Sequence, residues 1–330
     1  MSSKLPEPTL HSRTGRPSLR RRGESAQLLS PAPREAEALR ARSVGYSLTF
    51  WGTRGSIPTP GPRTSRYGGN TPCIGISDGE GRLVVLDAGS GLRPLGSAMM
   101  TEGGGMVAHL LLTHTHWDHI QGFPFFKPLG VVGNEVHVYG AAQEGVPLSE
   151  ILRRQMEPAV FPVPLSALAA TIMVHPVSEG TFVIDGFQVA AFRLRHPGTT
   201  LGYRLAPLGG GREVAYLTDN ELGPGGTYSV RSDWRTALVA FLGGVETLIH
   251  DAMYSESVIA ARAGWGHSTP REAIDLAADA GCKHLILFHH DPECDDEAID
   301  QRLRDAQSYA ASRAPDLEVE AACEGGRLTL

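Results

Sequence analysis

Cysteine and long apolar runs are scarce in this 330-residue sequence. Its four cysteines form no Cys-x-x-Cys pair and are too few to staple the chain, so a reducing, cytoplasmic setting is expected. Apolar stretches such as Val107–Leu112 and Ala237–Leu242 fall far below the ~18 residues that a membrane span needs. The N-terminus lacks the apolar core of a secretory signal, and its acidic residues are untypical of a transit peptide. We therefore expect neither a membrane span nor a targeting segment.

Excess positive charge is missing from most of the chain. The formal net charge is −6, yet residues 1–45 carry nine Lys or Arg against four Asp or Glu. Residues 46–330 hold 21 basic and 32 acidic side chains, a net charge of −11. Such a body disfavours nucleic acid as a partner, without excluding it, because polyanions gain affinity mainly from counterions released at basic surfaces.

The first 45 residues mix Pro, Ser, Arg and Gly without a sustained apolar period. Such a segment cannot bury enough surface to offset the entropy lost on ordering, so we predict a disordered basic tail at residues 1–45. Its charge would suit a tether to nucleic acid or membrane, and a solvated extension is the simpler interpretation. The folded domain is expected at residues 46–330.

From Tyr46 onward, short β-branched or Leu-rich runs are broken by Gly and Pro. The expected strands are Ser47–Trp51, Cys73–Ser77, Leu83–Asp87, Val107–Thr113, Glu135–Tyr139, Thr171–Pro176, Phe187–Arg195, Gly202–Leu205, Glu213–Thr218, Thr247–His250 and His284–Phe288. The expected helices are Leu92–Met100, Leu148–Gln155, Trp234–Leu242 and Pro270–Ala280. This pattern predicts an α/β domain whose sheet faces are covered by helices.

The helix at Pro270 has the clearest boundaries. Thr269 can act as N-cap, Glu272 completes a Thr-x-x-Glu capping box, and Gly281 ends the helix. The tripeptide His267-Ser268-Thr269 therefore lies at the positive end of a helix, where backbone N–H groups favour an anion such as phosphate.

The strongest motif is Thr113-His114-Thr115-His116-Trp117-Asp118-His119, which directly follows the apolar strand that begins at Val107. Imidazole nitrogen and carboxylate oxygen are ligands of borderline ions such as zinc, with manganese or iron as alternatives. Three imidazoles and a carboxylate at one strand exit could reach two neighbouring ions. The alternative interpretation is a solvated His-rich turn.

One motif supplies too few ligands for two metal ions, and further candidates follow other strands. They are His196, Asp219, Asp251 and the pair His289-His290. In an α/β sheet, functional groups gather at one edge of the strands, so these side chains are expected to converge. Each alone would more often be an ordinary surface or core residue, but their recurrence at strand exits favours a site.

Together these residues resemble the metallo-β-lactamase superfamily, and within it the phosphodiesterase branch that includes RNase Z and the phosphoribosyl cyclic-phosphate phosphodiesterases. The resemblance covers essentially all of residues 46–330. Besides the histidine motif, its blocks are Phe50–Ser56, Leu86–Gly89, Arg195–Pro197, Leu217–Asp219, His250–Ala252, Gly266–Thr269 and Leu287–His289. It implies a four-layer αβ/βα sandwich with a binuclear site for two divalent metal ions, zinc above all, at one edge.

The resemblance also assigns the ligands. It gives His114, His116 and His196 to the first metal, Asp118, His119 and His289 to the second, and Asp219 to both as a bridge. His289 is preferred to His290 because it aligns with the ligand that ends the branch's Leu-Ile-Leu-x-His strand.

Catalytic roles follow from the same resemblance. Two metals would make hydroxide available at neutral pH and neutralise phosphodiester oxygens, with Asp118 counted as both ligand and catalytic residue. His267 resembles the branch's general acid, which would protonate the leaving alkoxide, and Asp251 would orient its imidazole. Asp87 would accept a hydrogen bond from a ligand histidine. For His267, an ordinary histidine before a helix is the alternative.

Substrate contacts are expected from two segments. Arg54, with Arg63 and Arg66, lies in the most basic loop of the acidic body, although solvated loop arginines are an equal alternative. Ser268 and Thr269, beside the candidate acid, are the other expected contacts. The Pro-rich stretch 156–168 is either a lid over the site or a packing loop.

The resemblance leaves the substrate open. Short RNase Z enzymes recruit tRNA through a long arm between the third metal histidine and the bridging aspartate, but here only 22 residues separate His196 from Asp219. The N-terminal cysteines frequent in the cyclic-phosphate branch are also missing. We therefore predict hydrolysis of a small or cyclic phosphodiester, such as a cyclic nucleotide or phosphoribosyl cyclic phosphate. Because dimers are frequent in the related branch, the resemblance suggests a homodimer. An RNase Z-like tRNA 3′-endonuclease and a non-catalytic metal-binding sensor are the alternatives, and a β-lactamase or thioesterase fits less well.

Overall fold

A computed structural model describes residues 45–78, 82–100 and 105–330. The predicted basic tail falls outside these ranges, apart from Gly45, and stays a prediction. In the described part of the chain, no helix combines the length and the apolar character needed to cross a membrane.

Two mixed sheets of seven strands each form the centre of the described molecule. The first sheet has the order β14-β1-β2-β3-β4-β5-β6, with strands β1 (Ser47–Gly52), β2 (Cys73–Ser77), β3 (Arg82–Leu86), β4 (Val107–Leu111), β5 (Glu135–Gly140), β6 (Thr171–Pro176) and β14 (Arg327–Thr329). The second has the order β13-β12-β11-β10-β9-β8-β7, with strands β7 (Gly180–Ile184), β8 (Phe187–Arg193), β9 (Leu201–Pro207), β10 (Val214–Leu217), β11 (Thr247–Asp251), β12 (His284–Phe288) and β13 (Glu318–Ala321).

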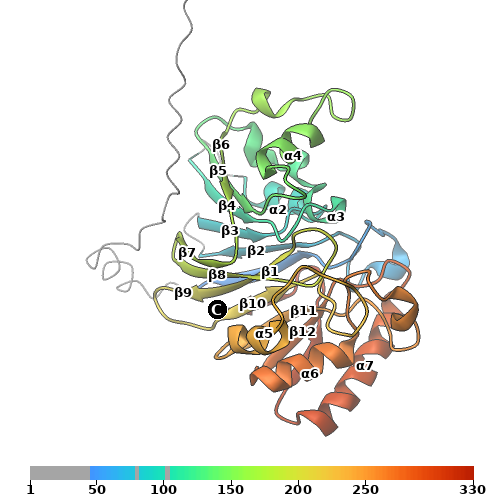
Figure 1. The fold of residues 1–330 in the computed structure, drawn as a ribbon. Helices are drawn as coiled ribbons and strands as arrows, with labels where there is room; N and C mark the ends of the chain where they lie inside the picture. The colour runs from blue at the N-terminus through green and yellow to red at the C-terminus, as the bar shows by residue number, and fades with distance from the viewer. Residues whose placement is uncertain (1–44, 79–81, 101–104) are drawn as a thin grey trace, which may run out of the picture.

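Helices cover the outer face of each sheet, and the two sheets face each other (Figure 1). The helices over the first sheet are α2 (Leu92–Ala98), α3 (Trp117–Ile120) and α4 (Leu148–Gln155), and those over the second are α5 (Trp234–Leu242), α6 (Pro270–Ala280) and α7 (Asp296–Arg313). Short 3-10 helices are η1 (Pro62–Thr64), η2 (Phe123–Phe125), η3 (Lys127–Gly130), η4 (Leu165–Ala167) and η5 (Ile259–Arg262). The predicted four-layer αβ/βα sandwich is confirmed.

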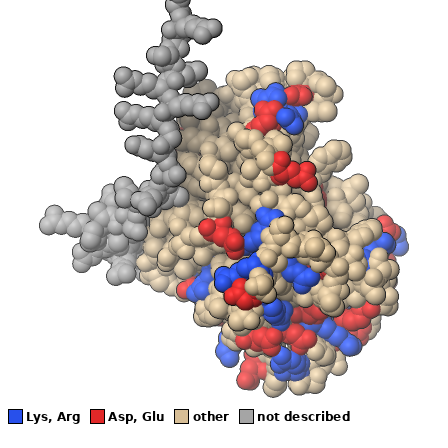
Figure 2. All heavy atoms as spheres, viewed as in Figure 1, with Lys and Arg blue, Asp and Glu red and all other residues tan. Residues whose placement is uncertain are grey.

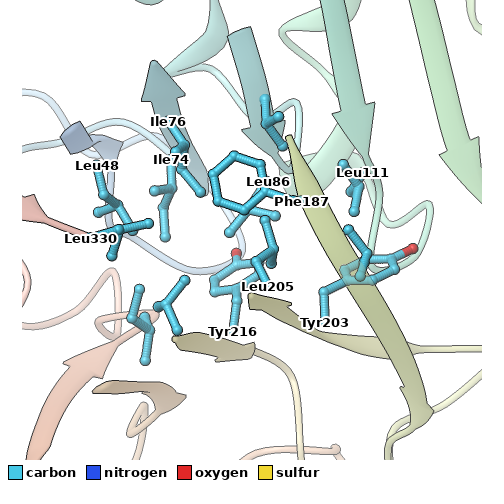
Figure 3. Close-up of a cluster of buried hydrophobic side chains, with 14 of the residues drawn as sticks. Leu48, Ile74, Ile76, Leu86, Leu111, Phe187, Tyr203, Leu205, Tyr216 and Leu330 are labelled. Carbon is cyan, nitrogen blue, oxygen red and sulfur yellow. The ribbon is translucent and has the colours of Figure 1, made fainter. Parts of the chain in front are cut away.

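Three apolar cores hold these layers together. The core between the sheets joins Leu48 and Ile74 of the first sheet to Phe187, Tyr203 and Tyr216 of the second (Figure 3). A second core lies under α5, α6 and α7, and a third under α2, α3 and α4. Central strand β11 is buried at every position, as expected for a parallel strand covered on both faces.

All of the expected strands and helices form, and none of their ends shifts by more than two residues. Helix α6 begins and ends as predicted, since the Thr269 side chain and Glu272 form the capping box and Gly281 adopts a left-handed conformation at φ 75°. The sequence prediction missed β7, β13, β14, the short helix α3, the 3-10 helices and the 18-residue helix α7. Helix α7 gives a weak apolar pattern because two of its four buried positions are alanines, Ala306 and Ala310, and a third is Asp296.

Parallel pairing sets the position of the candidate site. Strands β3, β4 and β5 run parallel in the first sheet, and β10, β11 and β12 run parallel in the second. Their carboxyl ends therefore lie together at one edge of each sheet. The candidate ligands lie in the segments that follow these ends and in the loop after β8.

Candidate metal centre

The first group of converging side chains contains His114, His116, His196 and Asp219, each offering a ligand atom within 4.8 Å of the others. The Nε2 atoms of His114 and His196 lie 3.7 and 3.6 Å from Asp219 Oδ2. The Nε2 atom of His196 also lies 3.1 Å from His116 Nδ1. Three imidazoles and one carboxylate oxygen thus surround a single point.

The second group contains Asp118, His119, Asp219 and His289, and all four are buried. Asp219 Oδ1 lies 3.2 Å from the Nε2 atoms of both His119 and His289. Asp118 Oδ2 lies 3.3 Å from the same two nitrogens. Two imidazoles and two carboxylates therefore make a compact set beside the first.

The carboxylate of Asp219 is shared between the groups in a specific way. Its Oδ2 faces His114 and His196 of the first group, and its Oδ1 faces His119 and His289 of the second. A carboxylate with one oxygen in each set is the arrangement required to bridge two cations.

Unsatisfied atoms test whether these residues suit a cation. The Nε2 atoms of His114 and His119 are buried and have no hydrogen-bond partner, although a buried polar atom without a partner is costly. Both atoms point at carboxylate oxygens. Imidazole and carboxylate donors in two four-membered sets suit two divalent ions of the zinc, manganese or iron type.

Charges in the cluster support the same conclusion. Burial raises the pKa of Asp118, but the His119 charge outweighs burial and holds this pKa well below its usual range. The pKa of Asp219 is lowered in the same way by the neighbouring histidines. Burial lowers the pKa of His114 well below its usual value and that of His196 to about 4, which leaves their nitrogen lone pairs free at neutral pH. Burial also acts against protonation of His119, but its three neighbouring carboxylates outweigh burial and raise its pKa. The cluster therefore attracts positive charge, as a cation site must.

Hydrogen bonds behind the cluster orient its imidazoles. His119 Nδ1 donates to Asp87 Oδ2 at 2.8 Å, which is the hydrogen bond expected of Asp87. The Asp87 carboxylate also accepts from the backbone of Thr113 and from the Tyr216 hydroxyl. His196 Nδ1 donates to the carbonyl of Gly266 at 3.0 Å. Each bond fixes the ring so that Nε2 faces the cluster.

Backbone strain concentrates at the same place. Asp87, Asp219 and His289 have φ of 60°, 55° and 60°, and they are three of five non-glycine residues with positive φ in the described ranges. Such conformations cost of order 1–3 kcal/mol each and persist only where the surroundings enforce them. Each of the three follows a strand by one or two residues, so the turn aims its side chain at the strand edge.

One glycine makes close packing in the cluster possible. Gly266 has φ 87°, and a Cβ atom there would lie 1.9 Å from His196 Nδ1. Only glycine allows the backbone carbonyl of this residue to approach the imidazole closely enough to accept its hydrogen bond.

His267 and Asp251 form a pair beside the two groups. His267 Nδ1 donates to Asp251 Oδ2 at 2.6 Å, and Asp251 Oδ1 accepts from the backbone N–H groups of Met253 and Ser268. Burial works against protonation, but the Asp251 charge outweighs it and raises the pKa of His267 to about 9. The His267 ring stacks on His289 at 5.1 Å between centroids. Both Asp251 oxygens are engaged, one by His267 and the other by backbone N–H groups, so the carboxylate is held against the Nδ1 side of the His267 ring.

Neighbouring His290 takes no part in either group. Its Nε2 donates to the carbonyl of Ala322 at 2.8 Å, so the ring points away from the cluster. The structure thus brings together every predicted ligand, with His289 in preference to His290.

The predicted substrate contacts need correction. Arg54 is fully buried, and its guanidinium donates to the carbonyls of Gly68, Asp291 and Cys294, so it fastens its loop instead of facing a substrate. Arg63 and Arg66 form ion pairs with Asp295 and Asp300.

The two residues after His267 are also occupied within the fold. Ser268 Oγ donates to the carbonyl of Asn220, and Thr269 Oγ1 accepts from the backbone N–H of Glu272 as the helix cap. Both side chains are buried. Their hydroxyls are therefore committed to hydrogen bonds within the fold, which argues against the predicted substrate contacts.

Glu221 is a residue that the sequence prediction missed. Its buried carboxylate accepts hydrogen bonds from the N–H groups of Gly226, Gly264 and Gly266 and from the Tyr228 hydroxyl, at 2.6 to 3.1 Å. It thereby ties the loop after Asp219 to the segment before His267. Its place two residues beyond Asp219, at a strand exit, was the signal available in the sequence.

The Pro-rich stretch 156–168 serves packing and also reaches the site. Leu165 and Leu168 pack on the core under α4, as a packing loop would. Val160 and Phe161 line a cavity of about 850 Å³ that His116 also lines. The stretch therefore forms one wall of a hollow beside the cluster.

The fold and the two ligand groups define a protein of the metal-dependent hydrolase type. The family model described as the beta-lactamase superfamily domain matches residues 82–290, more than half of the chain. The chain therefore belongs to this superfamily, and the resemblance predicted from its motifs is confirmed.

Individual relatives point to the same branch. Ribonuclease Z of Archaeoglobus fulgidus is 27% identical over 286 residues, which cover 74% of this chain and 87% of the relative. The short form of human tRNase Z superposes with a TM-score of 0.58 at 21% identity, covering 86% of this chain and 98% of the other. A diphosphatase of the PhnP family gives 0.59 at 20% identity, covering 86% and 97%. At these identities the superpositions show a shared fold.

Proposed function

We propose that this protein hydrolyses a small or cyclic phosphodiester with the help of two divalent metal ions, zinc above all. The observation that carries the proposal is the shared carboxylate of Asp219, with one oxygen in each of two ligand groups and the His267–Asp251 pair alongside. Ligands of the first ion would be His114, His116 and His196, and those of the second Asp118, His119 and His289.

Chemistry at this site divides between the ions and the chain. The bound ions would supply an activated water nucleophile and charge to neutralise the phosphodiester oxygens. Asp251 holds the Nδ1 side of His267, which leaves Nε2 as the ring nitrogen that gives a proton to the leaving oxygen. Burial of His267 and of every candidate ligand except the exposed His116 keeps bulk water from competing for these hydrogen bonds.

Two observations favour a small substrate. Strands β9 and β10 pair as a hairpin between His196 and Asp219, which leaves no room there for a tRNA-recruiting arm. Figure 2 shows acidic and basic side chains interspersed over α6 and α7, where Arg313 pairs with Asp275 and Asp279. A surface of paired charges releases few counterions to a polyanion.

A tRNA 3′-endonuclease is the second candidate, favoured by the relatives named ribonuclease Z. Such a protein would need basic surface elsewhere to hold tRNA. A cytoplasmic location and a homodimer remain predictions in either case.

The decisive experiment compares substrates on metal-loaded protein. We expect hydrolysis of cyclic mononucleotides, phosphoribosyl cyclic phosphate or bis(p-nitrophenyl) phosphate, with little cleavage of a 3′-extended tRNA. Efficient tRNA cleavage without small-diester hydrolysis would favour the second candidate. Tight metal binding without hydrolysis of any of these compounds would refute both.

A further inference from the structure

The cavity beside the cluster has an aromatic lining. Trp117, Phe125 and Phe161 contribute rings, and Trp117 and Phe125 are 83% and 54% exposed. Phe125 and Phe161 meet edge to face, with 5.4 Å between centroids. Large apolar side chains left open to solvent around a hollow are typical of a binding site. We call this hollow the aromatic cavity.

The aromatic cavity is continuous with the first ligand group. His116 belongs to both, and Trp117 stands in the chain between His116 and the ligand candidate Asp118. Pro197 and Gly198, which follow His196, also line the cavity. A substituent on a phosphate held at the cluster therefore has the cavity directly beside it.

Polar groups of the lining are mostly committed to the fold. Gln143 uses both ends of its amide on the backbone of Thr199, and Gln121 donates to Thr71. Arg154 is paired with Glu150, so its charge is already balanced. The buried Oε1 of Gln155 has no partner among the described residues, while its amide nitrogen donates to Ile120. Among the described residues that line it, the cavity thus offers aromatic faces and the exposed Glu144, and its one arginine already has a partner.

We propose that the aromatic cavity binds a flat aromatic group carried by the phosphodiester. This inference rests on the proposed phosphodiesterase activity. Ring faces stack on rings of any origin, so a nucleobase and a simple aryl ester share the chemistry. A volume of about 850 Å³ is ample for either.

Three diesters that share the same leaving group, p-nitrophenol, distinguish a nucleobase site from a general aryl site. They are methyl p-nitrophenyl phosphate, phenyl p-nitrophenyl phosphate and the p-nitrophenyl ester of thymidine 5′-phosphate. We expect kcat/KM for the phenyl and thymidine esters to exceed that for the methyl ester by about 5- to 100-fold. This is the gain in affinity that stacking one ring on an aromatic side chain usually provides. A thymidine ester above the phenyl ester identifies a nucleobase as the natural group, and equal rates identify a general aryl site.

Substitutions in the aromatic cavity test whether the preference for aryl esters arises there. Phe161→Ala and Phe125→Ala should bring the ratio of phenyl to methyl ester close to 1, because the stacked ring is lost. Val132→Ala, an exposed apolar residue outside the cavity, should keep the wild-type ratio. Equal rates on all three esters in the wild type, or a ratio that the two phenylalanine variants leave unchanged, would overturn the inference.

A binding measurement needs no turnover and separates the two proposals. Thymidine 5′-monophosphate and phenyl phosphate should quench tryptophan fluorescence in the wild type, and Trp117→Phe should lose most of this quenching, although three other tryptophans remain. Quenching without diester hydrolysis would support the aromatic binding site and refute the phosphodiesterase activity. Hydrolysis without quenching and without ester preference would support the phosphodiesterase activity and refute the aromatic binding site.

Discussion

Two clusters of histidines lie at different places in this fold, and only one has the form of a metal site. In the metal centre, the histidines follow strand ends, and the Nε2 atoms of four of them face Asp118 or Asp219; these are His114, His119, His196 and His289. In the second cluster, His109, His137 and His175 lie within strands β4, β5 and β6. We call it the histidine stack, since adjacent rings lie nearly parallel at 4.8 and 5.2 Å between centroids.

The difference lies in what each imidazole nitrogen faces. In the histidine stack, His109 Nδ1 bonds the Tyr139 hydroxyl, and His137 Nδ1 lies 3.0 Å from His175 Nε2. One carboxylate, that of half-exposed Glu135, comes within 3.9 Å of His137. Imidazoles that satisfy one another pack as aromatic rings, whereas imidazoles opposed by buried carboxylates attract a cation. Strand interiors favour the first arrangement and strand ends the second, because only the turn frees side chains to converge.

Removing the shared carboxylate should have the largest effect. We expect Asp219→Ala to deplete bound metal and to reduce activity by more than the ~10- to 100-fold typical of losing an outer partner, because both ligand groups lose an oxygen. Elemental analysis of the purified variant measures this loss. His137→Ala in the histidine stack is the matched control and should keep its metal. Retention of two metal ions by Asp219→Ala would refute the bridging role.

His267 tests the division between metal binding and proton transfer. We expect His267→Ala to keep its metal content but to lower kcat by about 10²- to 10⁴-fold, the usual contribution of a general acid. Activity per bound metal is the measurement. If the variant instead loses metal while each remaining metal works normally, His267 is a ligand and the assignment is wrong.

Glu221 should have a smaller effect, through positioning alone. In Glu221→Gln, the new amide N–H groups would face backbone N–H groups that now donate to the carboxylate. The loop that carries Gly266 should loosen, and with it the hydrogen bond to His196. We expect a roughly 10-fold weaker affinity for metal, measured by competition with a chelator.

A matched control exists for this change. Glu213→Gln also breaks carboxylate contacts, but to Arg204 in the β9–β10 hairpin, away from the cluster. Equal metal affinity in the two variants would show that Glu221 acts on general stability alone.

Sequence reasoning located the metal centre because its information is local. A contiguous motif after an apolar strand predicts both the ligands and the strand end, and the other candidates, such as Asp219 and His289, follow equally apolar strands. The capping box of α6 is likewise encoded within a few residues of Thr269. These features require no knowledge of distant contacts.

Side-chain direction in loops could not be predicted in the same way. Arg54 is buried by carbonyl groups of residues 237 and 240 positions away, and nothing near it in sequence signals their presence. Ser268 is bound by Asn220, in a loop 48 residues earlier. The aromatic cavity likewise joins Trp117 to residues of the 156–168 stretch only after folding.

The histidine stack should give the smallest effect, on stability alone. Burial, together with His137 and His175, lowers the pKa of His109 to about 4, whereas the unfolded chain has the ordinary value near 6.5. As the pH falls below ~6.5, the unfolded chain therefore takes up a proton that the folded protein refuses, and stability is lost until the pH reaches about 4. Between pH 7 and pH 5 this loss is about 2 kcal/mol. His109→Gln removes the group, so its free energy of unfolding should fall less over this interval than that of the wild type, whatever its stability at pH 7. Urea unfolding at the two pH values measures the difference, and parallel losses in both proteins would show that the His109 imidazole is already protonated in the folded stack.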